Sequence, residues 1–168
     1  ENSTLGERVV ERTHSSGATV AFCRKPGYLR RYACFSTHFG SVDDRYRIGG
    51  GEEICLPDGV AHFLEHKMFE GPEEDAFQQF SRLGAMANAF TSFVGTTYLF
   101  SCTDHFYPCL DHLVNFVQTP HFTSENVEKE KGIIGQEIRM YADHPGWRVY
   151  FNLLAGLYKR HPVAKDIA

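Results

Sequence analysis

Residues 86–102 read MANAFTSFVGTTYLFSC, in which two apolar stretches flank a short turn. Residues 86–91 and 96–102 are rich in β-branched and aromatic side chains, which favour strands. Residues 92–95 contain serine and glycine, which favour turns. This stretch predicts a β-hairpin, and helices elsewhere in the chain should cover one face of the sheet to which it belongs.

Helical periodicity occurs on both sides of this hairpin. Apolar side chains recur every three or four residues in a helix predicted to begin near Gly59, with Asp58 as its cap, and to end at Gly71. Further helices are predicted at residues 72–83, 106–117, 124–142 and 145–158. Thr123 or Ser124 is expected to cap the third of these.

Strands are also predicted in the first forty residues. Residues 18–24 and 31–39 have strand composition, and the Lys25-Pro26-Gly27 turn between them predicts that they pair with each other. Residues 40–58 are expected to form a connecting loop. Strands in two hairpins followed by helices predict an α+β fold, with an antiparallel or mixed sheet covered on one face by helices, in one domain spanning residues 1–168.

Composition excludes several classes of function. The net charge is −4 and no window holds five or six like charges, so nucleic acid is not an expected partner. No apolar run approaches the length of about 18 residues that membrane insertion requires. The five cysteines include no C-x-x-C pair, which argues against both a disulfide framework and a thiolate zinc site. We therefore expect a reducing compartment.

The helix predicted from Gly59 carries His62-Phe63-Leu64-Glu65-His66. Its two histidines lie one turn apart on one face and can bind a single zinc ion. A catalytic zinc site uses three protein ligands and leaves a fourth position for water. Glu65 beside the histidines is expected to take a proton from that water as general base. Taken alone, however, an exposed histidine pair on a surface helix explains the pentapeptide nearly as well.

The third ligand is expected from the helix that begins near Ser124. Glu130 and Glu137 share one face of it, about 10 Å apart along the axis, so both cannot bind the same ion. One carboxylate is expected to be a ligand and the other to accept the free N–H of a ligating histidine. Spacing alone does not decide which is which, and Glu130 can instead pair with Lys129 or Lys131 in solvent.

These motifs resemble those of the pitrilysin, or insulinase, family of inverted zincin metallopeptidases, and in particular its smaller bacterial members. The residues that carry the resemblance are 62–66, 88–92, Glu130, Glu137, Met140, Asp143 and Pro145. The resemblance implies that His62, His66 and Glu137 bind Zn²⁺, that Glu65 is the base, and that Glu130 lies behind a ligand. It also implies that the strand with Asn88 and Ala89 is a sheet edge to which an extended peptide substrate adds as a further strand.

The resemblance further implies that the chain is the N-terminal catalytic portion of a longer bacterial, cytoplasmic protein. A second half, or a partner subunit, is expected to close over the substrate. The implied function is a zinc-dependent endopeptidase that hydrolyses extended peptides or unfolded protein segments.

Two alternatives remain open. One is a noncatalytic peptide-binding or scaffold subunit of a heteromeric peptidase, because some family members keep the fold without the chemistry. The other is a purely structural zinc site, although this would leave Glu65 without a role, and structural sites usually recruit cysteines.

Overall fold

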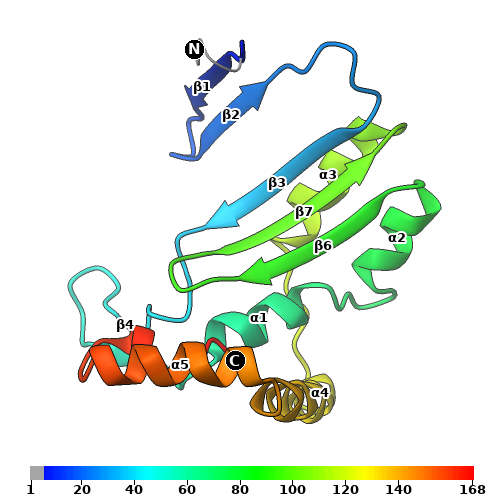
Figure 1. The fold of residues 1–168 in the computed structure, drawn as a ribbon. Coiled ribbons are helices and arrows are strands. Elements are labelled where there is room, and N and C mark those ends of the chain that lie inside the picture. Colours follow the sequence, from blue (N-terminus) through cyan, green and yellow to red (C-terminus); the bar gives the residue numbers. More distant parts are fainter. Residues whose placement is uncertain (1–5) are drawn as a thin grey trace. The chain divides into compact units, whose positions relative to one another are not determined.

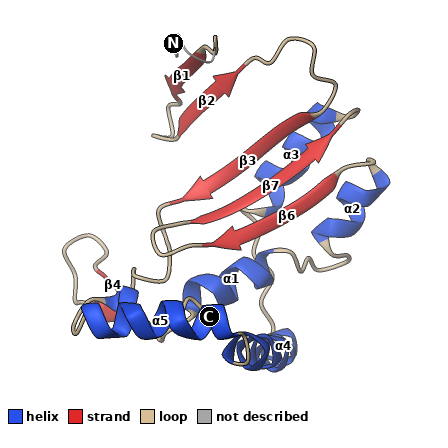
Figure 2. Cartoon of the chain, in the orientation of Figure 1, coloured by secondary structure: helices blue, strands red, loops and turns tan. Residues whose placement is uncertain are grey.

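The computed structural model describes residues 6–168, which divide into two compact units (Figures 1 and 2). The first unit ends at Arg31, and the second comprises Tyr32–Ala168. The expectation of one domain spanning residues 1–168 stays a prediction.

The first unit is a two-stranded antiparallel hairpin of β1 (Val9–Thr13) and β2 (Thr19–Cys23). A main-chain hydrogen bond from His14 N to Ala18 O, 2.8 Å long, closes the turn between them. Gly17 in this turn has a φ of +88°, a conformation that glycine adopts without steric strain.

The predicted pairing of residues 18–24 with residues 31–39 is therefore wrong. The Lys25-Pro26-Gly27 turn does exist, since Tyr28 N donates to Lys25 O at 3.4 Å. However, β2 pairs back onto β1, which precedes it, while the strand that begins at Arg31 joins a different sheet. The turn at Lys25-Pro26-Gly27 was predicted correctly, but its residues do not indicate which strand pairs with β2.

Three strands form the main sheet of the second unit, in the order β3-β7-β6. They are β3 (Arg31–Thr37), β7 (Thr96–Cys102) and β6 (Met86–Thr91). β6 and β7 pair antiparallel, from Met86 opposite Ser101 to Thr91 opposite Thr96. The hairpin predicted from residues 86–102 is confirmed, and β6 lies at an edge of the sheet.

A smaller antiparallel hairpin lies where a plain loop was expected. It pairs β4 (Arg45–Tyr46) with β5 (Ile54–Cys55), and each strand has only two residues.

Five α-helices and a 3-10 helix complete this unit. They are α1 (Val60–Met68), α2 (Ala76–Arg82), α3 (Phe106–Phe116), α4 (Ser124–Ala142), α5 (Pro145–Leu157) and η1 (Pro162–Ala164). The Thr123 side chain caps α4 as predicted, accepting from Asn126 N at 3.1 Å while Asn126 Oδ1 accepts from Thr123 N at 3.0 Å. The predicted Asp58 cap of α1 is wrong. Gly59 occupies that position with a φ of +78°, and Asp58 instead accepts from Lys165 Nζ at 2.7 Å.

Helices α2 and α3 pack on one face of the main sheet and enclose its core (Figure 1). The core consists of aromatic rings and small apolar side chains, chiefly Phe69, Phe80, Tyr98, Phe100, Cys109, Leu113 and Phe116. The fold is α+β with helices covering one face of an antiparallel sheet, as predicted. Helix α1 packs against β6 and β7, α4 packs against α1, and these contacts position the site.

Within residues 6–168, no helix combines the length and the apolar character that crossing a bilayer requires.

Candidate metal centre

Helix α1 buries polar side chains rather than the apolar ones that its sequence pattern emphasises. His62 is 9% exposed and Glu65 is 8% exposed, whereas Phe63 and Leu64 are only half-buried. Buried polar groups need partners, because losing water without compensation is unfavourable. The partners come from α4 and β6, two of the elements that pack on α1.

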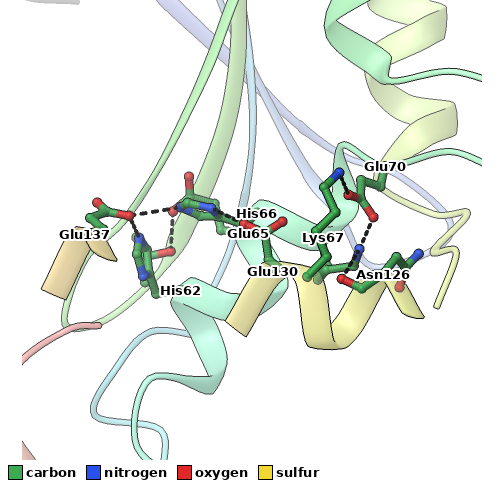
Figure 3. Close-up of polar contacts among 10 residues, drawn as sticks. His62, Glu65, His66, Lys67, Glu70, Asn126, Glu130 and Glu137 are labelled. Carbon is green, nitrogen blue, oxygen red and sulfur yellow. Dashed lines mark hydrogen bonds and ion pairs between the residues drawn. The ribbon is translucent and has the colours of Figure 1, made fainter. Parts of the chain in front are cut away.

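Three side chains converge at the contact between α1 and α4 (Figure 3). Glu137 Oε2 lies 3.8 Å from His62 Nε2 and 3.5 Å from His66 Nε2. Two ligands about 2.0–2.1 Å from a tetrahedral zinc ion lie about 3.4 Å from each other. The spacing of these donor atoms and their chemical types therefore fit zinc. Of the described residues, only these three form such a metal-binding group.

Glu130 orients one of the two imidazoles. Its Oε1 lies 2.9 Å from His66 Nδ1, and the Glu130 side chain is only 7% exposed. Because a carboxylate accepts, Nδ1 carries the proton and donates, which leaves the lone pair of Nε2 facing Glu137. The structure thus separates the two carboxylates that sequence spacing could not distinguish. Glu137 lies at the paired Nε2 atoms and Glu130 lies behind His66.

His62 lies in a more enclosed position. Burial, and after it the neighbouring His66, lower the pKa of His62, although Glu137 and Glu65 partly oppose this shift. The lowered pKa favours the neutral imidazole, which is the form that binds metal. Its Nδ1 is buried and has no hydrogen-bond partner between residues 6 and 168.

Glu65 lies next to the three donors and is held from β6. Thr91 Oγ1 donates to Glu65 Oε2 at 2.8 Å. Thr91 is a site residue to which the sequence analysis assigned no role. Strand alternation was the available signal, because it places Thr91 on the same face as Ala89.

The edge of β6 beside the donors is open. Ser92 N donates to Gly95 O at 2.8 Å, and hydrogen-bonded pairs then alternate along the antiparallel ladder. Asn88 therefore bonds to β7 through its main chain, whereas the N–H and C=O of Ala89 point away from β7. The side-chain oxygen of Asn88 accepts a hydrogen bond from the Ala89 N–H at 2.9 Å.

These groups surround one hollow with a volume of about 340 Å³. It is lined by the predicted residues His62, Glu65, His66, Asn88, Ala89 and Glu137, together with Phe90, Thr91, Tyr141, Trp147, Ile167 and Ala168. The Trp147 and Tyr141 rings stack with centroids 4.6 Å apart, and Trp147 Nε1 donates to Asp166 Oδ2 at 2.8 Å. Sequence reasoning did not assign these aromatic residues to the site. The chemical roles of all the predicted site residues stay predictions.

Comparison with known proteins gives a consistent result. The profile of the family described as Insulinase (Peptidase family M16) matches residues 52–168. The uncharacterized zinc protease YmfH of Bacillus subtilis is 51% identical over 169 residues, an alignment that covers 100% of this chain and 40% of YmfH.

Two solved structures share the fold. An M16-like peptidase from Alicyclobacillus acidocaldarius aligns with a TM-score of 0.91 and 46% identity, covering 97% of this chain and 38% of that protein. The peptidase M16 inactive domain from Pseudomonas fluorescens aligns with a TM-score of 0.77 and 20% identity, covering 95% and 38%. The present chain thus spans about two fifths of the length of these proteins. By its match over most of its length, the chain belongs to the insulinase family, peptidase family M16.

Proposed function

We propose that the full-length protein is a zinc-dependent endopeptidase that hydrolyses extended peptides or unfolded protein segments. One observation carries this proposal. Two imidazole nitrogens on α1 and one carboxylate oxygen on α4 converge at distances that suit zinc, with a further carboxylate, Glu65, beside them but outside the set. Three protein ligands would leave a fourth coordination position for the reaction, as catalytic zinc sites require.

His62, His66 and Glu137 would hold the ion. Zinc, when bound, polarises a carbonyl group and makes a water molecule more acidic. Glu65 accepts the proton of the attacking water on its carboxylate and passes it to the leaving amine. Thr91 holds Glu65 Oε2 and so limits the directions in which that carboxylate can point. Glu130 keeps the proton of His66 on Nδ1.

The open edge of β6 is suited to bind the peptide. The outward C=O of Ala89 can pair with an extended chain, and so can its N–H once the Asn88 side chain releases it. Such pairing depends little on side-chain identity. A peptide lying there passes beside Glu65 and the two histidines, because all of them line the same hollow. Only an extended segment can add to a sheet edge in this way, which is why unfolded substrates are proposed.

The relatives support a peptidase function, but this chain matches only part of their length. YmfH bears the name of a zinc protease, and this chain matches 40% of its length. We propose that the remaining part of the protein, or a partner subunit, closes over the hollow, and that the protein acts in the bacterial cytoplasm.

The proposal is tested by offering the zinc-loaded full-length protein one substrate in two states. A small disulfide-containing protein is compared with its reduced and carboxymethylated form, and fragments are identified by mass spectrometry. We expect internal cleavage of the unfolded form alone. Equal cleavage of both forms contradicts the requirement for an extended segment, and cleavage of neither contradicts the endopeptidase.

A second expectation concerns the strand edge. Ala89→Pro removes one outward N–H, and proline is tolerated in an edge strand where that group does not join the ladder. Losing one hydrogen bond of about 0.5–1.5 kcal/mol should raise KM for a peptide about 2- to 10-fold. Ala89→Ser, which keeps the N–H, is the matched control. Equal KM values in the two variants would remove Ala89 N from substrate binding.

The alternative is a noncatalytic peptide-binding or scaffold subunit. The fold itself allows it, since a protein described as an inactive domain shares it at a TM-score of 0.77. The outcome that supports it is saturable binding of the unfolded substrate with no cleavage by the zinc-loaded protein.

A further inference from the structure

Lys67 is fully buried beside the metal centre. It lies in the last turn of α1, and its exposed fraction is 0%. A buried ammonium group needs a partner, because removing an isolated charge from water is strongly unfavourable. Lys67 Nζ donates to Glu70 Oε2 and, at 3.4 Å, to the main-chain oxygen of Asn126 (Figure 3). Asn126 lies in the first turn of α4, so this lysine links the end of α1 to the start of α4.

Glu70 completes the link from the other direction. Lys129 of α4 lies 3.3 Å from Glu70 Oε1, so one lysine from each helix shares this carboxylate. The hydrogen bond from Lys67 is the largest cause that lowers the pKa of Glu70, and Lys129 adds to it. Glu70 is therefore ionised at neutral pH and holds both ammonium groups.

This contact involves the first turn of α4, the helix that carries Glu130 and Glu137. Asn126 is fixed by the reciprocal cap with Thr123. Glu130, which bonds to His66, follows one turn later, and Glu137 follows another seven residues along the same face. A regular helix transmits a shift or rotation at its first turn to both residues.

We propose that Lys67 is a positioning residue for the metal centre. By joining Asn126 and Glu70, it sets the position of α4 along and around its axis relative to α1, and so places Glu137 at the two histidines. The inference rests on the zinc site proposed above, but its test uses metal binding rather than hydrolysis.

Stability alone does not explain a lysine here. Replacing a buried ion pair by apolar residues of similar volume is often neutral or stabilising, whereas fixing a register is the best-attested use of such pairs. A methionine would fill the same space without losing hydration of a charge. The role of this lysine therefore lies in its directional contacts with Glu70 and Asn126.

The test compares zinc affinity in the full-length protein and its Lys67→Met variant, measured by competition with a chelator. We expect zinc to bind about 10-fold more weakly, the lower end of the loss seen when groups supporting metal ligands are removed. The visible spectrum of the Co²⁺-substituted variant should also change, because it reports the ligand geometry. Lys131→Met is the matched control, since Lys131 pairs with Glu128 within α4 and is exposed. The control should keep the affinity and the spectrum of the wild type.

A double variant separates positioning from folding. Lys67→Met with Glu70→Leu removes both charged partners and should recover any stability that the single variant loses, measured as Tm. We expect its zinc affinity to stay weak. Wild-type affinity and spectrum in the single variant, or their recovery in the double variant, would overturn the proposal. A wild type that binds zinc but hydrolyses nothing would instead contradict the endopeptidase function and leave this inference standing.

Discussion

Glu65→Gln is expected to lower kcat/KM of the full-length protein by about 10²- to 10⁴-fold while zinc remains bound. Glutamine has nearly the same shape but cannot accept the proton of the attacking water. Zinc should stay because Glu65 is not among the three converging donors. The variant should also fold, because the amide oxygen can still accept from Thr91 Oγ1, which lies 2.8 Å from Glu65 Oε2.

The measurement combines peptide hydrolysis with metal analysis of the same sample. Glu128→Gln is a suitable control, since its side chain is 70% exposed and pairs only with Lys131 among the described residues. That control should retain full activity and full zinc. Hydrolysis that continues unchanged in Glu65→Gln would exclude Glu65 as the base.

The second large effect is expected from His66→Ala. It removes one of the two nitrogens near Glu137 Oε2, and zinc affinity should fall by more than the roughly 100-fold seen for residues that only support ligands. Purified protein should then contain zinc well below one equivalent. The variant also leaves the buried Glu130 without its partner, which should cost about 1–3 kcal/mol of stability.

A second variant separates metal loss from unfolding. Glu137 is 24% exposed in its side chain, so Glu137→Ala removes the proposed carboxylate ligand with little loss of buried packing. We expect it to lose zinc while retaining the Tm of the wild-type apoprotein. His38→Ala, an exposed histidine on the same unit, should keep both. Stoichiometric zinc in His66→Ala and in Glu137→Ala would contradict the proposed ligand set.

Local features of the chain were predictable because interactions between residues close in the sequence determine them. The cap of α4 depends on Thr123 and Asn126, three residues apart, and the hairpin of β6 and β7 depends on one turn between adjacent strands. The histidine pair on α1 follows in the same way from the helical repeat.

Features that depend on distant partners were predicted less well. β2 pairs with β1 and not with β3, although all three segments have strand composition, so composition alone did not identify the partner. The cap of α1 was mispredicted because Asp58 pairs with Lys165, which is distant in the sequence. Thr91 and Trp147 look like an ordinary strand residue and an ordinary helix residue until the hollow between them is seen.

The sequence by itself identified candidate zinc ligands, because imidazole and carboxylate groups at helical spacing are visible without any coordinates, and their binding of zinc stays a prediction. It also pointed to the α+β class, because strand composition in two hairpins is followed by helical periodicity. Spacing left the roles of Glu137 and Glu130 open and only the resemblance assigned them, whereas the tertiary structure shows Glu137 at the histidine nitrogens and Glu130 behind His66, and shows that Lys67 is buried. The physical reason is that these relations depend on how α4 is placed against α1, and side-chain spacing within one helix contains no information on that placement.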